Sequence, residues 1–107
     1  MRLDQVELNA LRHLFGNEPS MSALNADEVT CIVIERALTS VGFYSIIKFT
    51  DAREVEPSTE VSKNFKHPCL KKGGAYVCWV NQDLTFCLEG FSKESAWPRA
   101  LTPLALQ

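Results

Sequence analysis

The sequence predicts an α+β fold in which an N-terminal helix packs on a four-stranded antiparallel sheet made of two hairpins. Apolar residues recur at helical spacing near the N-terminus. Two later segments each contain two short runs of β-branched and aromatic residues, separated by turn residues. A helix with one apolar stripe and a sheet with one apolar face bury those surfaces against each other. The 107 residues fit a single α+β domain, 1–107.

The helix is expected over residues 3–15. Its apolar residues recur every three or four positions, at Leu3, Val6, Ala10, Leu11 and Leu14. Gly16 and Pro19 follow, and residues of these types commonly end helices. The apolar stripe of this helix is the surface that would cover the sheet.

The first hairpin is expected from residues 29–38 and 43–50, which are rich in β-branched and aromatic side chains. A two-residue turn at 40–41 places Ile34 opposite Ile47. Ser-Val is poor chemistry for a tight hairpin turn, so a bulge at the glycine that follows is an alternative. The buried face would hold Ile32, Ile34, Leu38, Phe43, Ile47 and Phe49.

The second hairpin is expected from residues 75–80 and 84–91 around a turn at 81–83. A loop of even length places Cys78 opposite Cys87. The buried, helix-facing side would then hold Val77, Trp79, Leu84, Phe86 and Leu88.

The other face of the predicted sheet is partly exposed, as is common for antiparallel sheets with one buried face. We expect it to carry the candidate surface residues Glu35, Tyr44, Lys48, Tyr76 and Glu89. Between the hairpins, residues 51–70 show no clear period and are expected to form a long loop.

Charge is distributed unevenly along the chain. Residues 1–60 carry 5 basic and 10 acidic side chains, whereas residues 61–107 carry 6 basic and 3 acidic ones. The overall net charge of −2 gives no support to nucleic-acid binding. The densest acidic stretch is the candidate partner-binding site: Asp51, Glu54, Glu56 and Glu60. It would steer a basic protein partner toward this chain, or else it is a solvated loop.

The N-terminus does not resemble a signal peptide, because Asp4 and Glu7 interrupt its apolar residues. No apolar run approaches the roughly 18 residues of a membrane span. We therefore expect a cytoplasmic protein without a membrane partner, whose four cysteines are reduced thiols.

No motif in the sequence predicts catalysis, a metal or a cofactor. In "KKGG", residues 71–74, the lysines precede the glycines and a strand follows, unlike a phosphate-binding loop. The cysteines lie 38, 9 and 9 positions apart, without the short paired spacing of a zinc site. Cys78 and Cys87 fall within predicted strands, where thiols behave as small apolar side chains. Glu35 and Glu89 are more simply explained as solvated or lysine-paired carboxylates than as an acid–base pair.

Three pieces of the chain resemble a set of small uncharacterised bacterial proteins. These are "TSVGFYS" (39–45), a Gly-Gly before a strand, and "LEGF" followed by "WP" (88–98). That set has a GVGFYT-like hairpin and an LEGY…WP-like ending, and this chain departs from it at Ser40, where a glycine would be expected. The resemblance implies a shared hairpin and core rather than any chemistry. Size, acidity and sheet architecture are also similar, at the level of class, to bacterial toxin-immunity proteins.

Together these features predict a small cytoplasmic, non-enzymatic binding protein, of the kind that neutralises a basic toxin. The alternative is a small-ligand-binding domain, or a minor enzyme, with a pocket between sheet and helix. A homodimer is compatible with either.

Overall fold

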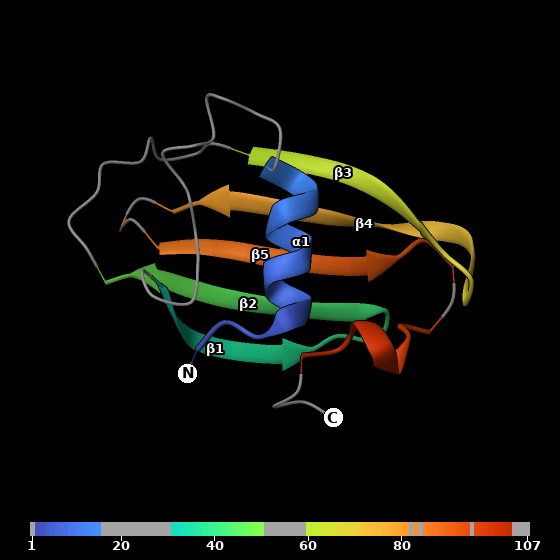
Figure 1. The fold of residues 1–107 in the computed structure, drawn as a ribbon, viewed down its shortest axis with the longest axis horizontal. Helices are drawn as coiled ribbons and strands as arrows, with labels where there is room; N and C mark the ends of the chain where they lie inside the picture. Colours follow the sequence, from blue (N-terminus) through green and yellow to red (C-terminus); the bar gives the residue numbers. More distant parts are fainter. Residues whose placement is uncertain are drawn as a thin grey trace.

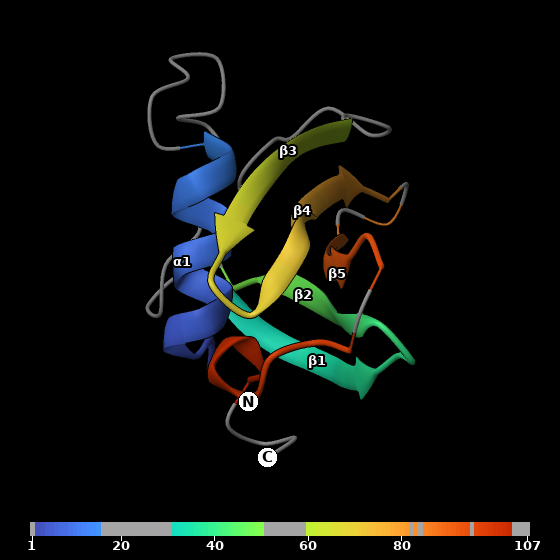
Figure 2. The same cartoon turned by 90° about the vertical axis from the view of Figure 1, so that its right-hand side faces the viewer.

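The computed structural model describes residues 2–15, 31–50, 60–81, 83, 85–94 and 96–103. Within these residues, helix α1 (Gln5–Phe15) precedes the strands, and a short 3₁₀ helix, η2 (Arg99–Leu101), follows them. The strands are β1 (Cys31–Leu38), β2 (Gly42–Phe49), β3 (Glu60–His67), β4 (Leu70–Val80) and β5 (Thr85–Ser92). Figure 1 shows α1 lying across the sheet, and Figure 2 shows that it covers one face.

The sheet is antiparallel and has five strands in the order β1-β2-β5-β4-β3. This confirms the α+β fold, whereas the prediction of four strands was wrong. Both predicted hairpins form, and β2 pairs with β5 to join them. The additional strand, β3, lies within residues 51–70, the segment that was predicted to be a loop. Val61 and Phe65 are the residues of β3 that pack against the core. An antiparallel strand with one solvent-exposed face needs apolar residues only on the other face.

The first hairpin follows the predicted register only near its turn. The two-residue turn forms, with Thr39 N–H donating to the Gly42 carbonyl at 2.9 Å. A β-bulge between Val33 and Glu35 then shifts the pairing by one residue. The inward residues beyond the bulge are therefore Cys31 and Val33. Those predicted to be buried, Ile32 and Ile34, are 42% and 52% exposed.

The second hairpin differs from prediction because its loop has odd length. Asn81 N–H donates to the Thr85 carbonyl at 2.8 Å, which leaves three residues in the loop. Cys78 therefore lies opposite Leu88 rather than Cys87. A one-residue slip moves every side chain of a strand to the other face. The helix-facing residues of β4 are thus Tyr76, Cys78 and Val80, whereas Val77 and Trp79 lie half-buried on the opposite face.

The core forms between α1 and the inner face of the sheet. The helix contributes three of the predicted apolar residues and Leu8, Leu3 is buried just before the helix begins, and Val6 is half-buried. The sheet contributes large side chains from its central strands, namely Phe43, Ile47, Tyr76, Phe86 and Leu88. Burial of these surfaces against each other is the main stabilising term for the fold.

The segments that carried the bacterial resemblance meet at one end of this core. Gly42 and Gly90 lie on neighbouring strands that pass close together, and a Cβ on Gly42 would fall 1.8 Å from the Gly90 carbonyl oxygen. The Trp97 ring packs at 5.8 Å from the Phe43 ring, and its Nε1 donates to the Leu101 carbonyl at 2.8 Å. These residues therefore hold β2, β5 and the C-terminal segment together.

Burial of Tyr76 predicts a loss of stability at high pH. Desolvation raises the pKa of its phenol from 10.0 to about 12. The unfolded chain ionises this phenol before the folded one does, so stability is complete below pH 10 and falls as the pH rises toward 12. In a Tyr44→Phe variant, phenolate absorbance should appear near pH 12 and coincide with unfolding. A phenolate signal that saturates near pH 10 in a folded protein would contradict the burial of this ring.

Candidate functional site

The sheet face opposite α1 carries side chains in rows that cross all five strands. In the central row, the register partners run in the order Glu35, Ile46, Cys87, Trp79 and Glu60. The three middle side chains are half-buried, and the two glutamates at the edge strands are exposed. The row therefore has an apolar centre with a carboxylate at each end.

The neighbouring row supports the same surface. Its members, in order, are Ala37, Tyr44, Glu89, Val77 and Ser62. The Tyr44 hydroxyl lies 3.5 Å from Glu35 Oε1 and donates toward it, which links the two rows. We call the ten residues of the two rows, with Ile32, Ile34 and Lys48, the outer face.

Exposed apolar residues line edge strand β1 and the turn after it, and two of them, Ile32 and Ile34, belong to the outer face. All four of the large hydrophobic residues that are exposed in the described part of the chain lie between positions 32 and 41: Ile32, Ile34, Leu38 and Val41. Ile32 lies opposite Lys48 on the outer face, and the bulge places Ile34 beside Glu35. Clustered apolar exposure of this kind marks an interaction site more often than scattered exposure does.

The described segments that cover the sheet lie on its other face. Helix α1 packs there against the core, and Trp97 contacts the rings of Phe43, Phe65 and Tyr76, which point to that same side. Figure 2 shows α1 on one side of the sheet. The outer face therefore presents its apolar centre away from the helix.

Acidic groups outnumber basic ones on the outer face. Glu35, Glu60 and Glu89 contribute carboxylates, and Lys48 contributes an ammonium group. Hydrogen bonds from the Thr85 hydroxyl and amide lower the pKa of Asp83, in the β4–β5 loop, and so favour its charged form. This electrostatic character complements a basic surface.

The structure places most of the predicted surface residues together. Four of the five predicted for the exposed sheet face share the outer face: Glu35, Tyr44, Lys48 and Glu89. Tyr76 was wrongly assigned, because the register slip in β4 turns it into the core, where its ring stacks on Phe65 at 4.4 Å. Glu60 begins β3 and lies opposite Trp79. The other predicted acidic residues, Asp51, Glu54 and Glu56, lie outside the described residues.

Sequence reasoning missed Trp79, Ile32 and Ile34 as surface residues. Their position depends on the loop parity of β4–β5 and on the bulge in β1. The sequence of β4 also fits the other alternation, in which Tyr76 and Cys78 point toward the helix and Trp79 points away from it.

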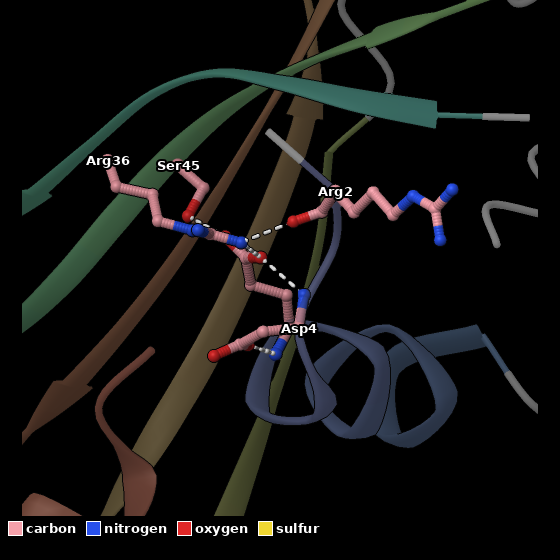
Figure 3. Close-up of polar contacts among 5 residues, drawn as sticks. Arg2, Asp4, Arg36 and Ser45 are labelled. Carbon is pink, nitrogen blue, oxygen red and sulfur yellow. Dashed lines mark hydrogen bonds and ion pairs between the residues drawn. The ribbon is translucent and has the colours of Figure 1, made fainter. Parts of the chain in front are cut away.

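A polar cluster lies between α1 and the sheet and contains the ion pair of Glu7 with Arg36. Figure 3 shows Arg36 and Ser45 pointing toward the start of the helix. Glu7 accepts from Arg36 Nε at 2.9 Å and from Nη2 at 2.5 Å, and it also accepts from the Ser45 hydroxyl. The hydrogen bond that Arg36 donates to Glu7 raises the pKa of Arg36 above its ordinary value, although burial acts in the opposite direction. Arg36 and Ser45 are register partners on β1 and β2, so the cluster fixes the helix to the sheet.

Reciprocal bonds make Glu7 part of a capping box as well. Its carboxylate accepts from Asp4 N–H at 2.9 Å, while its own N–H donates to Asp4 Oδ1 at 3.0 Å. Among the described residues every buried side-chain nitrogen and oxygen has a hydrogen-bond partner, and the bonds of this cluster join the start of α1 to the sheet.

Cys87 contributes a thiol to the outer face. Cys87 is half-buried, and its Sγ accepts from Asn81 Nδ2 at 3.3 Å. Within the described ranges, no group of three or more His, Cys, Asp or Glu side chains is placed to hold a metal ion. Among those same residues, no helix has the length and hydropathy that crossing a membrane requires.

Comparison with known proteins leaves the site without a template. No family model matches this chain, and no curated protein or solved structure does.

Proposed function

We propose that this chain is a non-enzymatic, cytoplasmic binding protein that recognises a basic protein partner through its outer face. By the same proposal it neutralises that partner, as an immunity protein neutralises a toxin. The observation that carries the proposal is the central row, in which Ile46, Cys87 and Trp79 lie between two exposed glutamates.

The composition of this row is that of a protein-binding surface. Interfaces concentrate their affinity in a few aromatic and aliphatic side chains near the centre, surrounded by a polar rim. Trp79 and Tyr44 are residues of the types enriched at such centres. Glu35 and Glu60 lie at the two edges of the sheet, where rim charges act mainly on the rate of association.

Charge selects the kind of partner. A second copy of this chain would bring the same three outer-face glutamates toward their counterparts, whereas a basic surface would attract them. In the sequence, Asp51, Glu54 and Glu56 precede Glu60. A basic partner is therefore favoured over a homodimer.

The test is affinity capture with purified chain as bait, compared between wild type, Glu35→Gln/Glu60→Gln and Lys72→Gln. We expect wild type and Lys72→Gln to retain the same basic protein at equal stoichiometry. The double glutamate variant should bind the purified partner several-fold more weakly at low salt, and the difference should shrink at high salt because ions screen exposed charges.

Two outcomes would count against the proposal. One is a bound protein that the glutamate variant retains with unchanged affinity at low salt. The other is self-association of the chain with no retained partner, measured by sedimentation, which would make the outer face a homodimer surface.

A further inference from the structure

A groove of ≈ 930 Å³ opens where the C-terminal end of α1 meets the β3–β4 hairpin, away from the outer face. Six of its lining residues are basic or histidine: His13, Lys66, His67, Lys71, Lys72 and Lys93. The four lysines and His13 are exposed, and His67 is half-buried. The described lining residues include no carboxylate.

Backbone irregularities bring these residues together. The register shifts between Phe65 and His67, which leaves Lys66 at a bulge. Gly73 has a φ of 73°, and a Cβ there would lie 2.7 Å from the Phe65 carbonyl oxygen. Lys93 N–H donates to the Gly73 carbonyl at 3.2 Å, so the segment after β5 joins the same wall.

The two histidines are held in defined orientations. His13 Nε2 lies 2.9 Å from the Asn64 carbonyl oxygen, and because that oxygen can only accept, this ring nitrogen carries the hydrogen. His67 Nδ1 accepts from Cys69 N–H at 3.1 Å, which leaves its Nε2 as a donor. His67 Nε2 is therefore the histidine donor left for a ligand, because the hydrogen on His13 Nε2 is taken up by the Asn64 carbonyl.

The charge of the groove is only weakly compensated by its described neighbours. Lys72 Nζ lies 3.8 Å from Glu94 Oε2, and the two side chains are 69% and 52% exposed. An ion pair this exposed contributes little and is readily replaced. Apolar surface from Phe65, Pro68 and Leu70 lies among the cationic groups.

We propose that this groove binds a phosphorylated small molecule. Lysine ammonium groups are effective point-charge partners for phosphate oxygens. The apolar residues between the lysines would contact an uncharged body attached to the phosphate, and the volume lies within the usual range of small-molecule sites, roughly 300–1,000 Å³. This site is independent of the proposed function, because the groove and the outer face use different residues.

The experiment is a calorimetric titration of the purified chain with ATP, pyrophosphate and adenosine as probes. We expect saturable binding of ATP and weaker binding of pyrophosphate, with adenosine weaker than both. Amide chemical shifts of the ¹⁵N-labelled chain should change at Phe65–Gly73 and at Lys93 rather than on the outer face.

A matched pair of variants tests which lysines bind the phosphate. Lys71→Gln/Lys72→Gln removes two exposed lysines of the groove and should weaken ATP binding about tenfold or more, because bonds to charged groups are lost. Lys48→Gln removes an exposed lysine from the outer face and should leave ATP binding unchanged. Thermal melts of both variants should match wild type, since these side chains are exposed.

The proposal fails if ATP and pyrophosphate show no saturation at millimolar concentration. It also fails if adenosine binds as tightly as ATP, or if Lys48→Gln weakens ATP binding as much as the double variant. The first two outcomes leave the proposed protein-binding function untouched, because the titration involves no protein partner, whereas the third would move phosphate binding to the outer face.

Discussion

Replacing Glu7 with alanine is expected to lower the free energy of unfolding by about 3–5 kcal/mol, the usual cost of removing one partner of a buried ion pair. Glu7 is completely buried, and the side chain of Arg36 is only 6% exposed. Without the carboxylate, the guanidinium would retain the Arg2 carbonyl, at 2.6 Å, as a hydrogen-bond acceptor but would lose its counter-charge. The loss is large compared with the total stability of about 5–15 kcal/mol that is typical of small domains.

Urea denaturation of Glu7→Ala and Glu60→Ala provides the measurement and its control. Glu60 is exposed, and its replacement should change stability by no more than about 0.5 kcal/mol. A Glu7→Leu/Arg36→Met double variant should recover much of the loss, because apolar residues can replace a buried ion pair at little cost. Equal effects of Glu7→Ala and Glu60→Ala would show that the buried pair does not hold α1 to the sheet.

Replacing Phe86 with alanine is the second change with a large expected effect, again about 3–5 kcal/mol. Phe86 is fully buried at the centre of the sheet, and its ring lies 5.1 Å from that of Phe49. Its register partners are Ile47 and Val80, both of which are also buried. Removing the ring would leave a cavity that these rigid strands cannot close.

Trp79→Ala is the informative comparison for Phe86→Ala. In the predicted register, Trp79 would face the helix, and its replacement by alanine would lower the free energy of unfolding as much as that of any core aromatic residue. In the structure it is half-buried on the outer face, so its loss should cost about 1–2 kcal/mol. Denaturant titrations of the two variants would measure both values. Equal losses for the two variants would place Trp79 in the core and remove the centre of the proposed contact surface.

The sequence was sufficient for the elements whose signals are local. The spacing of Ala10, Leu11 and Leu14 contributes to the prediction of α1, and the β-branched runs predict the strands of both hairpins. The edge strand β3 was missed because Ser62 and Asn64 alternate with a lysine, a pattern that resembles a polar loop. Its pairing with β4 depends on a long-range contact that no local pattern encodes.

Strand register was harder to predict because it depends on single residues. One bulged residue at Ile34 and one additional loop residue before Thr85 each exchange the two faces of a strand. Glu35 and Tyr44 lie between the bulge and the turn, and the two faces of β5 were predicted correctly, which is why Glu35, Tyr44 and Glu89 were found. The basic groove could not be predicted, because Lys66, Lys71 and Lys93 meet only through the hairpin geometry.

Trp79 lies at the centre of the protein-binding surface that we propose. The most direct test is an equilibrium titration of the captured basic partner with wild type and Trp79→Ala, using circular dichroism to establish that the variant is folded. Loss of a central aromatic contact costs about 2 kcal/mol or more, so the account predicts a Kd that rises roughly thirtyfold. An unchanged Kd for the folded variant would contradict the account.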